Sequence, residues 1–335
     1  MPSQLLHILF GEDVYATIYR RVESRFGTAA GRIAVKDANR KAFALGCQGP
    51  DIFYHSQGRR PVGLEYGTLL HRRGVGAFSA ELLRGCNGND ALVSYALGFI
   101  THAILDRQAH PYIVYKSQVS GFDNYHAFFE RIIDVLMLKL LRGQEITSWD
   151  QEDLLAEICE NPPPGLKDLL AQALIATFPE RAGKDAKLRS RIENAFLDCA
   201  GFYRRTAPAY SQEEDLDFPL QNHQLVYLYP RELPGHIDFL NNGKKPWYYP
   251  AGEEKEDRRS FLEIYDETVA AAADSLTGII SSYLEEGVFP PDEAAANYIG
   301  EAIGNGGLNI VDESGKPCAP CRSDPLPLQS LIWSL

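Results

Sequence analysis

At 335 residues the chain is long enough to bury a large core, in one elaborated domain or in two small ones. Its composition, 45% hydrophobic and 23% charged, is that of an ordinary globular protein. A formal net charge of -12 argues against nonspecific attraction to nucleic acid or to anionic lipid at long range, so we expect no stable nucleic-acid partner.

Apolar residues recur at spacings of three and four along most of the chain, which predicts an all-α fold. The predicted helices cover residues 11–26, 33–46, 75–86, 89–117, 121–141, 150–160, 166–178, 185–206, 261–285 and 292–303. Residues 47–72, which contain Gly49-Pro50, are expected to form a turn with a short helix. The helix over 89–117 is apolar nearly all round, which predicts a central, buried position.

Two helix ends carry capping signals. Gly46 is expected to cap the end of the second helix. Ser260 and Glu263 have the spacing of a capping box, which predicts that a helix begins at residue 261.

Residues 207–257 have a different composition, rich in proline, glycine and aromatic residues. This segment is predicted to be a long irregular loop, with a short β-ribbon as one option, and such loops often carry function. Residues 304–335 are expected to form a tail rich in Pro and Gly. We therefore expect one domain over residues 1–335.

No stretch approaches the ~18 apolar residues of a membrane span. The first ten residues contain no Lys or Arg, so the sequence predicts a cytoplasmic protein without a secretory signal. The scattered Cys47, Cys86, Cys159 and Cys199 are expected to stay reduced. Cys318 and Cys321 form a single C-x2-C pair with no second pair to complete a zinc site, and their role stays open.

The strongest signal lies within the central helix. His102, Asp106 and His110 follow one another at intervals of four, so each step rotates about 40° around the helix and all three share one stripe. Burying three ionisable groups is costly unless each is satisfied. A metal cluster would satisfy them together.

Further candidate ligands flank this helix. His126 and Glu130 share one face of the next helix, which should be an antiparallel neighbour. Upstream, Asp51 follows the Gly-Pro turn, His71 is expected to start a helix, and His7 lies in the first apolar segment. The predicted metal site therefore lies within residues 1–135.

The alternative is that these residues are hydrogen-bonded core histidines and helix-stabilising pairs. For the five residues on the two central helices this is disfavoured, because burial without ligands would leave several polar groups unpaired. For His7 both interpretations stay open. His55 is either a substrate contact or exposed, and exposure is favoured; His223 and His236 are assigned no role.

Histidine with Asp and Glu, and no Cys, is typical of catalytic zinc sites that keep a position open for water. Eight ligands suit two or three ions with a carboxylate bridging a pair. Mn or Fe would accept the same ligands.

These residues resemble the zinc-dependent phospholipase C family, whose fold and three-zinc site are shared with fungal zinc nucleases that cut single strands. The family carries H-x3-D-x5-H and then H-x3-E. Here His102-x3-Asp106 and His126-x3-Glu130 match, whereas the interval from Asp106 to His110 is about two residues shorter. The family's earlier ligands resemble Asp51 and His71, and its N-terminal His resembles His7.

The resemblance implies three ions, two of which share Asp106. The first set is Asp51, His71, His102 and the bridging Asp106. The second set is His110, His126 and Glu130. The third set is Asp106 and His7 with the N-terminal amine and carbonyl.

The expected function is hydrolysis of a phosphodiester, a phospholipid or a related compound, by a hydroxide shared between two ions. Asp51 is expected to orient or deprotonate the attacking water. Trp247 and Tyr248 either contact a cationic head group or simply pack the loop. The alternatives are a single-strand nuclease of the same fold and a non-catalytic metal-binding protein.

Overall fold

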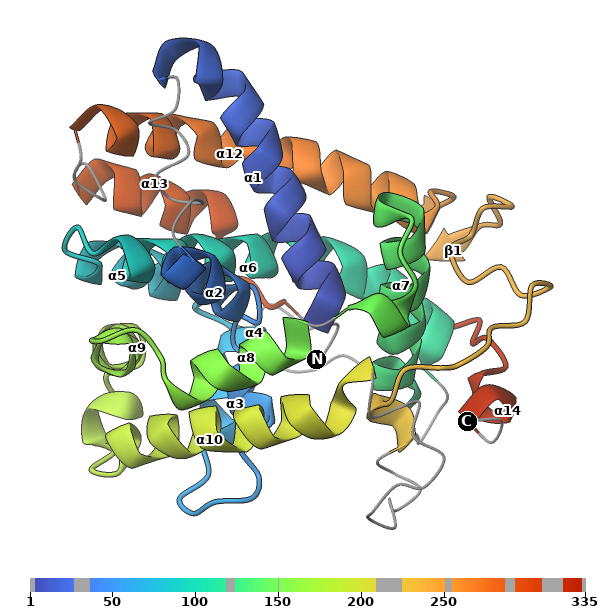
Figure 1. The fold of residues 1–335 in the computed structure, drawn as a ribbon, viewed down its shortest axis with the longest axis horizontal. Coiled ribbons are helices and arrows are strands. Elements are labelled where there is room, and N and C mark those ends of the chain that lie inside the picture. Colours follow the sequence, from blue (N-terminus) through green and yellow to red (C-terminus); the bar gives the residue numbers. More distant parts are fainter. Residues whose placement is uncertain are drawn as a thin grey trace.

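The computed structural model describes residues 4–26, 37–118, 124–149, 151–208, 225–250, 255–286, 293–308 and 322–332. Within these ranges the chain is built of helices, and its one sheet is a two-stranded ribbon (Figure 1). The all-α prediction is confirmed.

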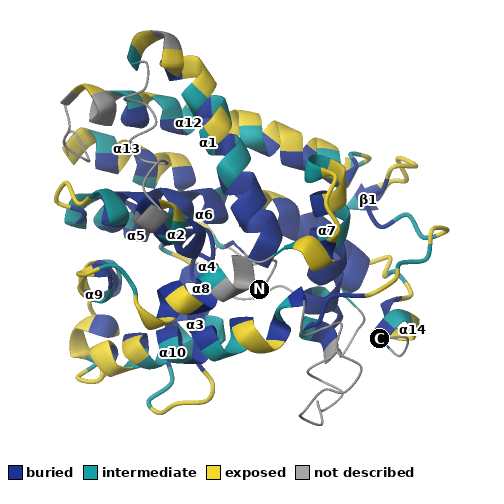
Figure 2. Ribbon diagram, in the orientation of Figure 1, coloured by how far each residue is buried: buried dark blue, intermediate teal, exposed yellow. Residues whose placement is uncertain are grey.

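The central element is α6 (Asp90–Ser117), which is buried along nearly all of its length (Figure 2). It begins where the side chain of Asn89 accepts hydrogen bonds from the backbone N–H groups of Ala91 and Leu92, the ordinary way to satisfy a helix start. Its neighbours are α1 (Gln4–Phe26), α2 (Asp37–Gly46), α7 (Asn124–Arg142) and α12 (Phe261–Glu286). The prediction of a central, buried helix is confirmed.

Two glycines bring α2 and α6 into close backbone contact. A Cβ atom at Gly98 would lie 2.3 Å from the carbonyl oxygen of Phe43, and one at Gly46 would lie 2.1 Å from that of Tyr95. Neither position has room for a side chain. Gly46 is the last residue of α2 and not a left-handed residue after it, so its expected capping role is wrong; it allows close packing instead.

The remaining helices surround this centre. They include α3 (Asp51–Tyr54), α4 (Leu64–Arg72), α5 (Val75–Gly85), α8 (Gln151–Glu160), α9 (Leu166–Thr177), α10 (Leu188–Thr206) and α13 (Glu293–Ile303). Figure 1 shows α12 and α13 on one side of α6, and α8 and α10 on the other. α10 packs against α3, α8 and α9, and α13 packs against α5.

The predicted capping box is present at the start of α12. The backbone N–H of Ser260 donates to Oε2 of Glu263 at 2.7 Å, and the backbone N–H of Glu263 donates to Oγ of Ser260 at 3.3 Å. The reciprocal pair satisfies two N–H groups at this helix start, as the spacing predicted.

Short elements lie in the segments that were expected to be irregular. β1 (Trp247–Tyr248) pairs antiparallel with β2 (Glu256–Asp257), so the β-ribbon option is confirmed. The predicted tail contains α14 (Leu328–Ile332). Three 3-10 helices complete the described elements: η2 (Ile146–Ser148), η3 (Ala182–Lys184) and η4 (Leu225–Tyr227).

Two predicted helix starts are wrong. The first helix begins at Gln4 rather than at residue 11, so it includes His7. His71 lies in the last turn of α4 rather than at the start of a helix, because α4 ends just before Gly74, whose positive φ of 76° also marks the beginning of α5.

Cys47, Cys86, Cys159 and Cys199 are free thiols, as expected, and all are buried. Cys318, Cys321 and His223 lie outside the described residues. Among the helices that the structure describes, none combines the length and the apolar character needed to cross a bilayer.

Candidate metal centre

The eight predicted ligands come from five helices and converge beside α6. His7 is on α1, Asp51 on α3 and His71 on α4, while α6 carries three of the eight and α7 carries two. Seven of them are buried, with at most 4% of the residue exposed, and the side chain of His126 is 16% exposed. Convergence of so many ionisable groups inside a core needs a physical cause.

The first group is formed by Asp51, His71 and His102, whose ligand atoms all lie within 4.8 Å of one another. Nε2 of His71 is 3.0 Å from Oδ1 of Asp51. Nδ1 of His71 is 2.8 Å from the carbonyl oxygen of Gly67, and Nδ1 of His102 is 3.0 Å from that of Cys47. A proton on Nδ1 donated to each carbonyl leaves Nε2 free to bind a metal, which is how metal-binding histidines are usually oriented.

The backbone turn before Asp51 is shaped to the His102 ring. Gly49 has a φ of 53°, and a Cβ atom there would lie 2.3 Å from Cδ2 of His102. Only glycine combines the left-handed backbone with contact to the face of this ring. The Gly-Pro turn therefore places Asp51 and at the same time fixes the position of His102.

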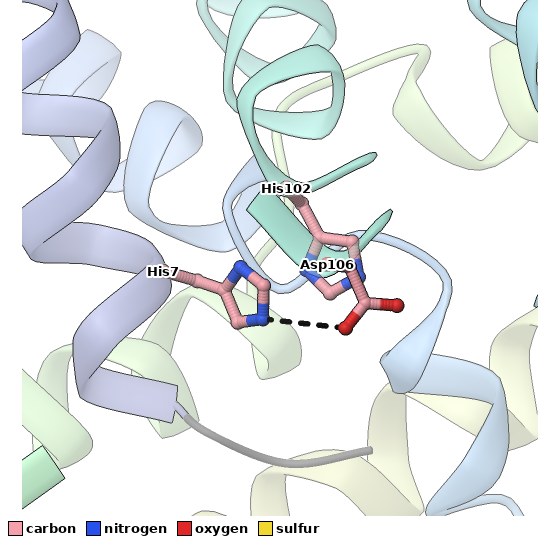
Figure 3. Close-up of side chains that lie close together, drawn as sticks. All are labelled: His7, His102 and Asp106. Carbon is pink, nitrogen blue, oxygen red and sulfur yellow. Dashed lines mark ion pairs between the residues drawn. The ribbon is translucent and has the colours of Figure 1, made fainter. Parts of the chain in front are cut away.

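Asp106 lies between His71 of the first group and two further histidines, His7 and His110. Its Oδ2 is 3.8 Å from Nε2 of His71, and its Oδ1 is 2.8 Å from Nδ1 of His110 and 3.9 Å from Nε2 of His7. Figure 3 shows the last of these contacts, with the His7 and His102 rings close together; their centroids are 4.0 Å apart. His7, His102 and Asp106 thus form a second group with ligand atoms within 4.8 Å.

The third group joins α6 to α7 and consists of His110, His126 and Glu130. Nε2 of His126 is 3.1 Å from Oε1 of Glu130, one helical turn further along α7. The rings of His110 and His126 stack with centroids 5.0 Å apart. The i,i+4 spacing predicted from the sequence therefore presents both α7 residues to α6.

The electrostatics favour neutral imidazoles at His7 and His102, whereas His110 is held as an ion pair with Asp106. Burial lowers the pKa of His7 well below its usual value and also lowers the pKa of His102. Burial would lower the pKa of His110 too, but the adjacent Asp106 carboxylate outweighs it and raises that pKa. Burial would raise the pKa of Asp106, and the charge of His110 together with its hydrogen bond lowers it instead. Neutral His and ionised Asp are the forms that bind metal.

Several buried ligand atoms have no hydrogen-bond partner among the described residues. They are Nε2 of His102, Oδ2 of Asp106 and Oε2 of Glu130. Each belongs to a group whose other members are close enough to share an ion, so the donor set fits zinc: His and carboxylates, no Cys, and a carboxylate at the junction.

A cleft of about 640 Å³ opens beside the first group, with Asp51 in its wall. His55 also lines it. The expectation that His55 is exposed is wrong: the residue is half-buried, and its ring stacks on Phe202 with centroids 3.7 Å apart. Burial lowers the pKa of His55 to about 3, so the ring is neutral near pH 7.

Trp247 and Tyr248 do not line this cleft. The Trp247 side chain is fully buried; its Nε1 donates to the carbonyl oxygen of Arg259, and its ring meets Tyr112 edge to face at 5.5 Å. The Tyr248 hydroxyl donates to Glu256. These contacts favour the interpretation that both rings pack the loop. His236 is exposed.

Three residues that line the cleft were not predicted from the sequence: Phe202 and Arg205 of α10 and Tyr227 of η4. These residues lie far from the ligands in the chain and follow no metal-ligand spacing. Nothing in the periodicity of α10 separates a cleft-facing aromatic residue from a core one.

Comparison with known proteins assigns the family. A model of the family described as zinc dependent phospholipase C matches residues 6–181, which is more than half of the chain and includes all eight predicted ligands. No curated protein and no solved structure gives a match. The matched span runs from α1 into the segment after α9 and contains the whole ligand set described above. The chain belongs to the zinc-dependent phospholipase C family.

Proposed function

We propose that this protein is a zinc-dependent phosphodiester hydrolase of the phospholipase C type, acting on a phospholipid or a related phosphodiester. The observation that carries the proposal is the position of Asp106 between groups of buried ligands, one of which borders an open cleft. A structural metal site is usually closed, whereas a catalytic one keeps a side open to its substrate.

Each group has a candidate role. Asp51, His71 and His102 would hold one ion, and His110, His126 and Glu130 would hold another, with Asp106 shared. A further ion would lie against His7 and Asp106. Zinc bound there would supply Lewis acidity toward a phosphate and activate water near neutral pH.

Asp51 is the proposed catalytic residue. It lines both the ligand group and the cleft, so its carboxylate can orient a water molecule toward phosphorus and accept a proton from it. The neutral imidazole of His55, one helical turn after Asp51, borders the same space and would contact the substrate.

The first test is the metal content of protein purified without added zinc or chelator. We expect two to three zinc ions per chain and hydrolysis of bis(p-nitrophenyl) phosphate that a chelator abolishes and zinc restores. Zero or one metal per chain would contradict the multi-ion site. Mn or Fe in place of zinc would keep the mechanism and change the cofactor.

A single-strand nuclease is the second candidate, because Phe202 and Tyr227 in the cleft offer faces on which bases stack. Cleavage of a single-stranded oligonucleotide faster than any phospholipid would favour it. A protein that binds zinc, unfolds without it and cleaves neither class would be a non-catalytic metal-binding protein. The cytoplasmic location predicted from the sequence stays a prediction.

A further inference from the structure

We propose that the cleft beside Asp51 selects phosphodiesters whose polar group carries a second negative charge, and that Arg205 binds this charge. The inference rests on the proposed function and names the substrate class of the same site. It is carried by the shape of the cleft, the pairing of its charged residues and the position of one guanidinium.

The cleft has the dimensions and the position of a head-group site. Its volume of about 640 Å³ is within the usual range for small-molecule pockets. Asp51 forms part of its wall, so a group bound there lies next to the metal ligands. Phe202 and Arg205 of α10 form another part of the wall.

The loop that follows α3 is fixed against this wall. The backbone N–H groups of Gly58 and Arg59 both donate to Oδ2 of Asp198, each at 2.9 Å. A Cβ atom at Gly58 would lie 3.0 Å from the Asp198 carboxylate. The loop and α10 therefore hold one side of the cleft in a defined shape before any ligand binds.

The charged residues of the cleft are not equally available. Arg59 pairs with Asp198 at 2.7 Å, and Arg204 makes two hydrogen bonds to Glu160 at 2.5 and 2.7 Å. These pairs neutralise two of the arginines and both acidic residues of the cleft other than Asp51. For Arg205 the described part of the chain provides no hydrogen bond or ion pair.

The guanidinium of Arg205 lies along the cleft wall. A Cβ atom at Gly201, one turn earlier on α10, would be 3.1 Å from Nη1 of Arg205, and both residues line the cleft. The glycine leaves room for the guanidinium to lie close to the helix backbone, and the exposed Arg205 side chain stays accessible to a ligand in the cleft. Its N–H groups form a planar fork that matches a phosphate or carboxylate.

The rest of the wall is uncharged and includes several aromatic rings. The His55 ring stacks on Phe202, and Phe202 meets Tyr227 edge to face at 5.4 Å. Aromatic rings alone would suit a quaternary ammonium group. Here Asp198 and Glu160 are already paired with arginines, and Arg205, which has no partner among the described residues, lines the same cleft, so an anion is favoured over a cation.

The experiment compares three short-chain lipids on the zinc-loaded protein. Dihexanoyl phosphatidylglycerol phosphate carries a second phosphate, dihexanoyl phosphatidylglycerol lacks it, and dihexanoyl phosphatidylcholine carries a cation. We expect kcat/KM to be highest for the first, by about 10-fold over phosphatidylglycerol, the gain of one charge-assisted contact. Arg205→Gln should reduce this ratio to near one, and Arg205→Lys should retain part of it.

Arg189→Gln is the matched control, because Arg189 lies on the same helix, pairs with Asp168 and is not part of this cleft. It should leave the ratio unchanged. A preference for phosphatidylcholine, or the same ratio in wild type and Arg205→Gln, would overturn the inference while leaving the hydrolase intact.

A binding measurement separates this inference from the proposed function. Calorimetry should show glycerol bisphosphate binding the zinc-loaded protein more tightly than glycerol phosphate, and the difference should disappear in Arg205→Gln. If no phosphodiester is cleaved, the proposed function fails and calorimetry still decides the inference. Equal binding of the two probes to the wild type would refute it.

Discussion

Oδ2 of Asp106 lies 3.8 Å from Nε2 of His71, although the two residues come from different helices and are separated in the chain by all of α5. The other oxygen of the same carboxylate faces His7 and His110. One side chain of α6 therefore contacts residues of α1, α4 and α6 itself.

Asp106→Asn should remove metal and activity together. The amide keeps the volume of the carboxylate but loses the charge that stabilises adjacent cations. We expect the loss of at least one zinc ion per chain and a fall of roughly 100-fold or more in the rate of bis(p-nitrophenyl) phosphate hydrolysis. Substituting a residue that only hydrogen-bonds to a metal ligand typically costs about 10- to 100-fold, and loss of a ligand itself should cost at least as much. Metal analysis and steady-state rates measure both. Asp274→Asn, at an exposed site, is the control; full zinc content in Asp106→Asn would show that Asp106 is not a ligand.

Gly49→Ala should weaken metal binding by displacing the His102 ring. The new methyl group would lie 2.3 Å from Cδ2 of His102, so the ring or the turn must move. We expect zinc affinity to fall by about 10- to 100-fold, measured by competition with a chelator. Gly88→Ala is a suitable control, since Gly88 has a φ of 71° but no atom within 4 Å of its added Cβ. It reproduces the backbone strain without the clash, and an equal loss of affinity in both variants would contradict this explanation.

Removal of the metal should destabilise the protein reversibly. Without a cation, the buried carboxylates of Asp106 and Glu130 and their histidine neighbours lose their common partner. We expect the melting temperature to fall by roughly 5–10 °C with a chelator and to return with added zinc. Differential scanning calorimetry provides the measurement. A melting temperature that does not change with the chelator would support the alternative that these are hydrogen-bonded core histidines without a metal.

The half-buried His55, whose pKa is lowered, should make the metal-free protein less stable in acid. Burial lowers its folded-state pKa to about 3, whereas the unfolded chain binds a proton near pH 6.5. Between these values the unfolded state holds more protons, so stability declines as the pH falls from about 6.5 toward 3. Urea unfolding of chelator-treated protein at several pH values should show a shallower decline in His55→Gln. If the free energy of unfolding depends on pH in the same way in both proteins, the pKa of His55 is not lowered in the folded state.

Trp247→Ala should reduce stability rather than change specificity. The indole is fully buried against Tyr112 and Tyr249, so its loss leaves a large cavity. We expect the free energy of unfolding to fall by about 3–5 kcal/mol, with zinc content retained. Urea denaturation and a comparison of the three lipids test this. An altered lipid preference at wild-type stability would restore Trp247 as a substrate contact.

Most helices and the five converging residues of α6 and α7 were predicted from the sequence because both depend on local periodicity. His7, Asp51 and His71 follow no such spacing and were proposed from their positions and from the family resemblance. Intervals of four on an apolar helix specify one face, and His102, Asp106 and His110 share that face in the structure. His71 was placed on a wrong helix position because Arg73 and Gly74, which separate α4 from α5, were not recognised as the boundary.

The cleft could not be predicted in this way. Phe202 and Arg205 line the same cleft as Asp51 because α10 packs against α3, a contact between distant parts of the chain. Similarly, the half-burial of His55 depends on a ring from α10. Local pattern specifies which face of a helix is apolar, and it does not specify which distant helix will cover it.

The close contacts of Gly46 and Gly98 have a consequence for the direction in which the ligands point. Gly98 lies about one turn before His102 on α6 and meets the backbone of α2 directly. A helix held by side chains can roll slightly when one of them is exchanged, whereas one seated backbone on backbone cannot roll without a clash. The direction in which His102, Asp106 and His110 point is therefore fixed by the backbone contact between α2 and α6. Conservative substitutions elsewhere in the core should leave this direction unchanged, whereas one methyl group added at Gly46 or Gly98 should alter it.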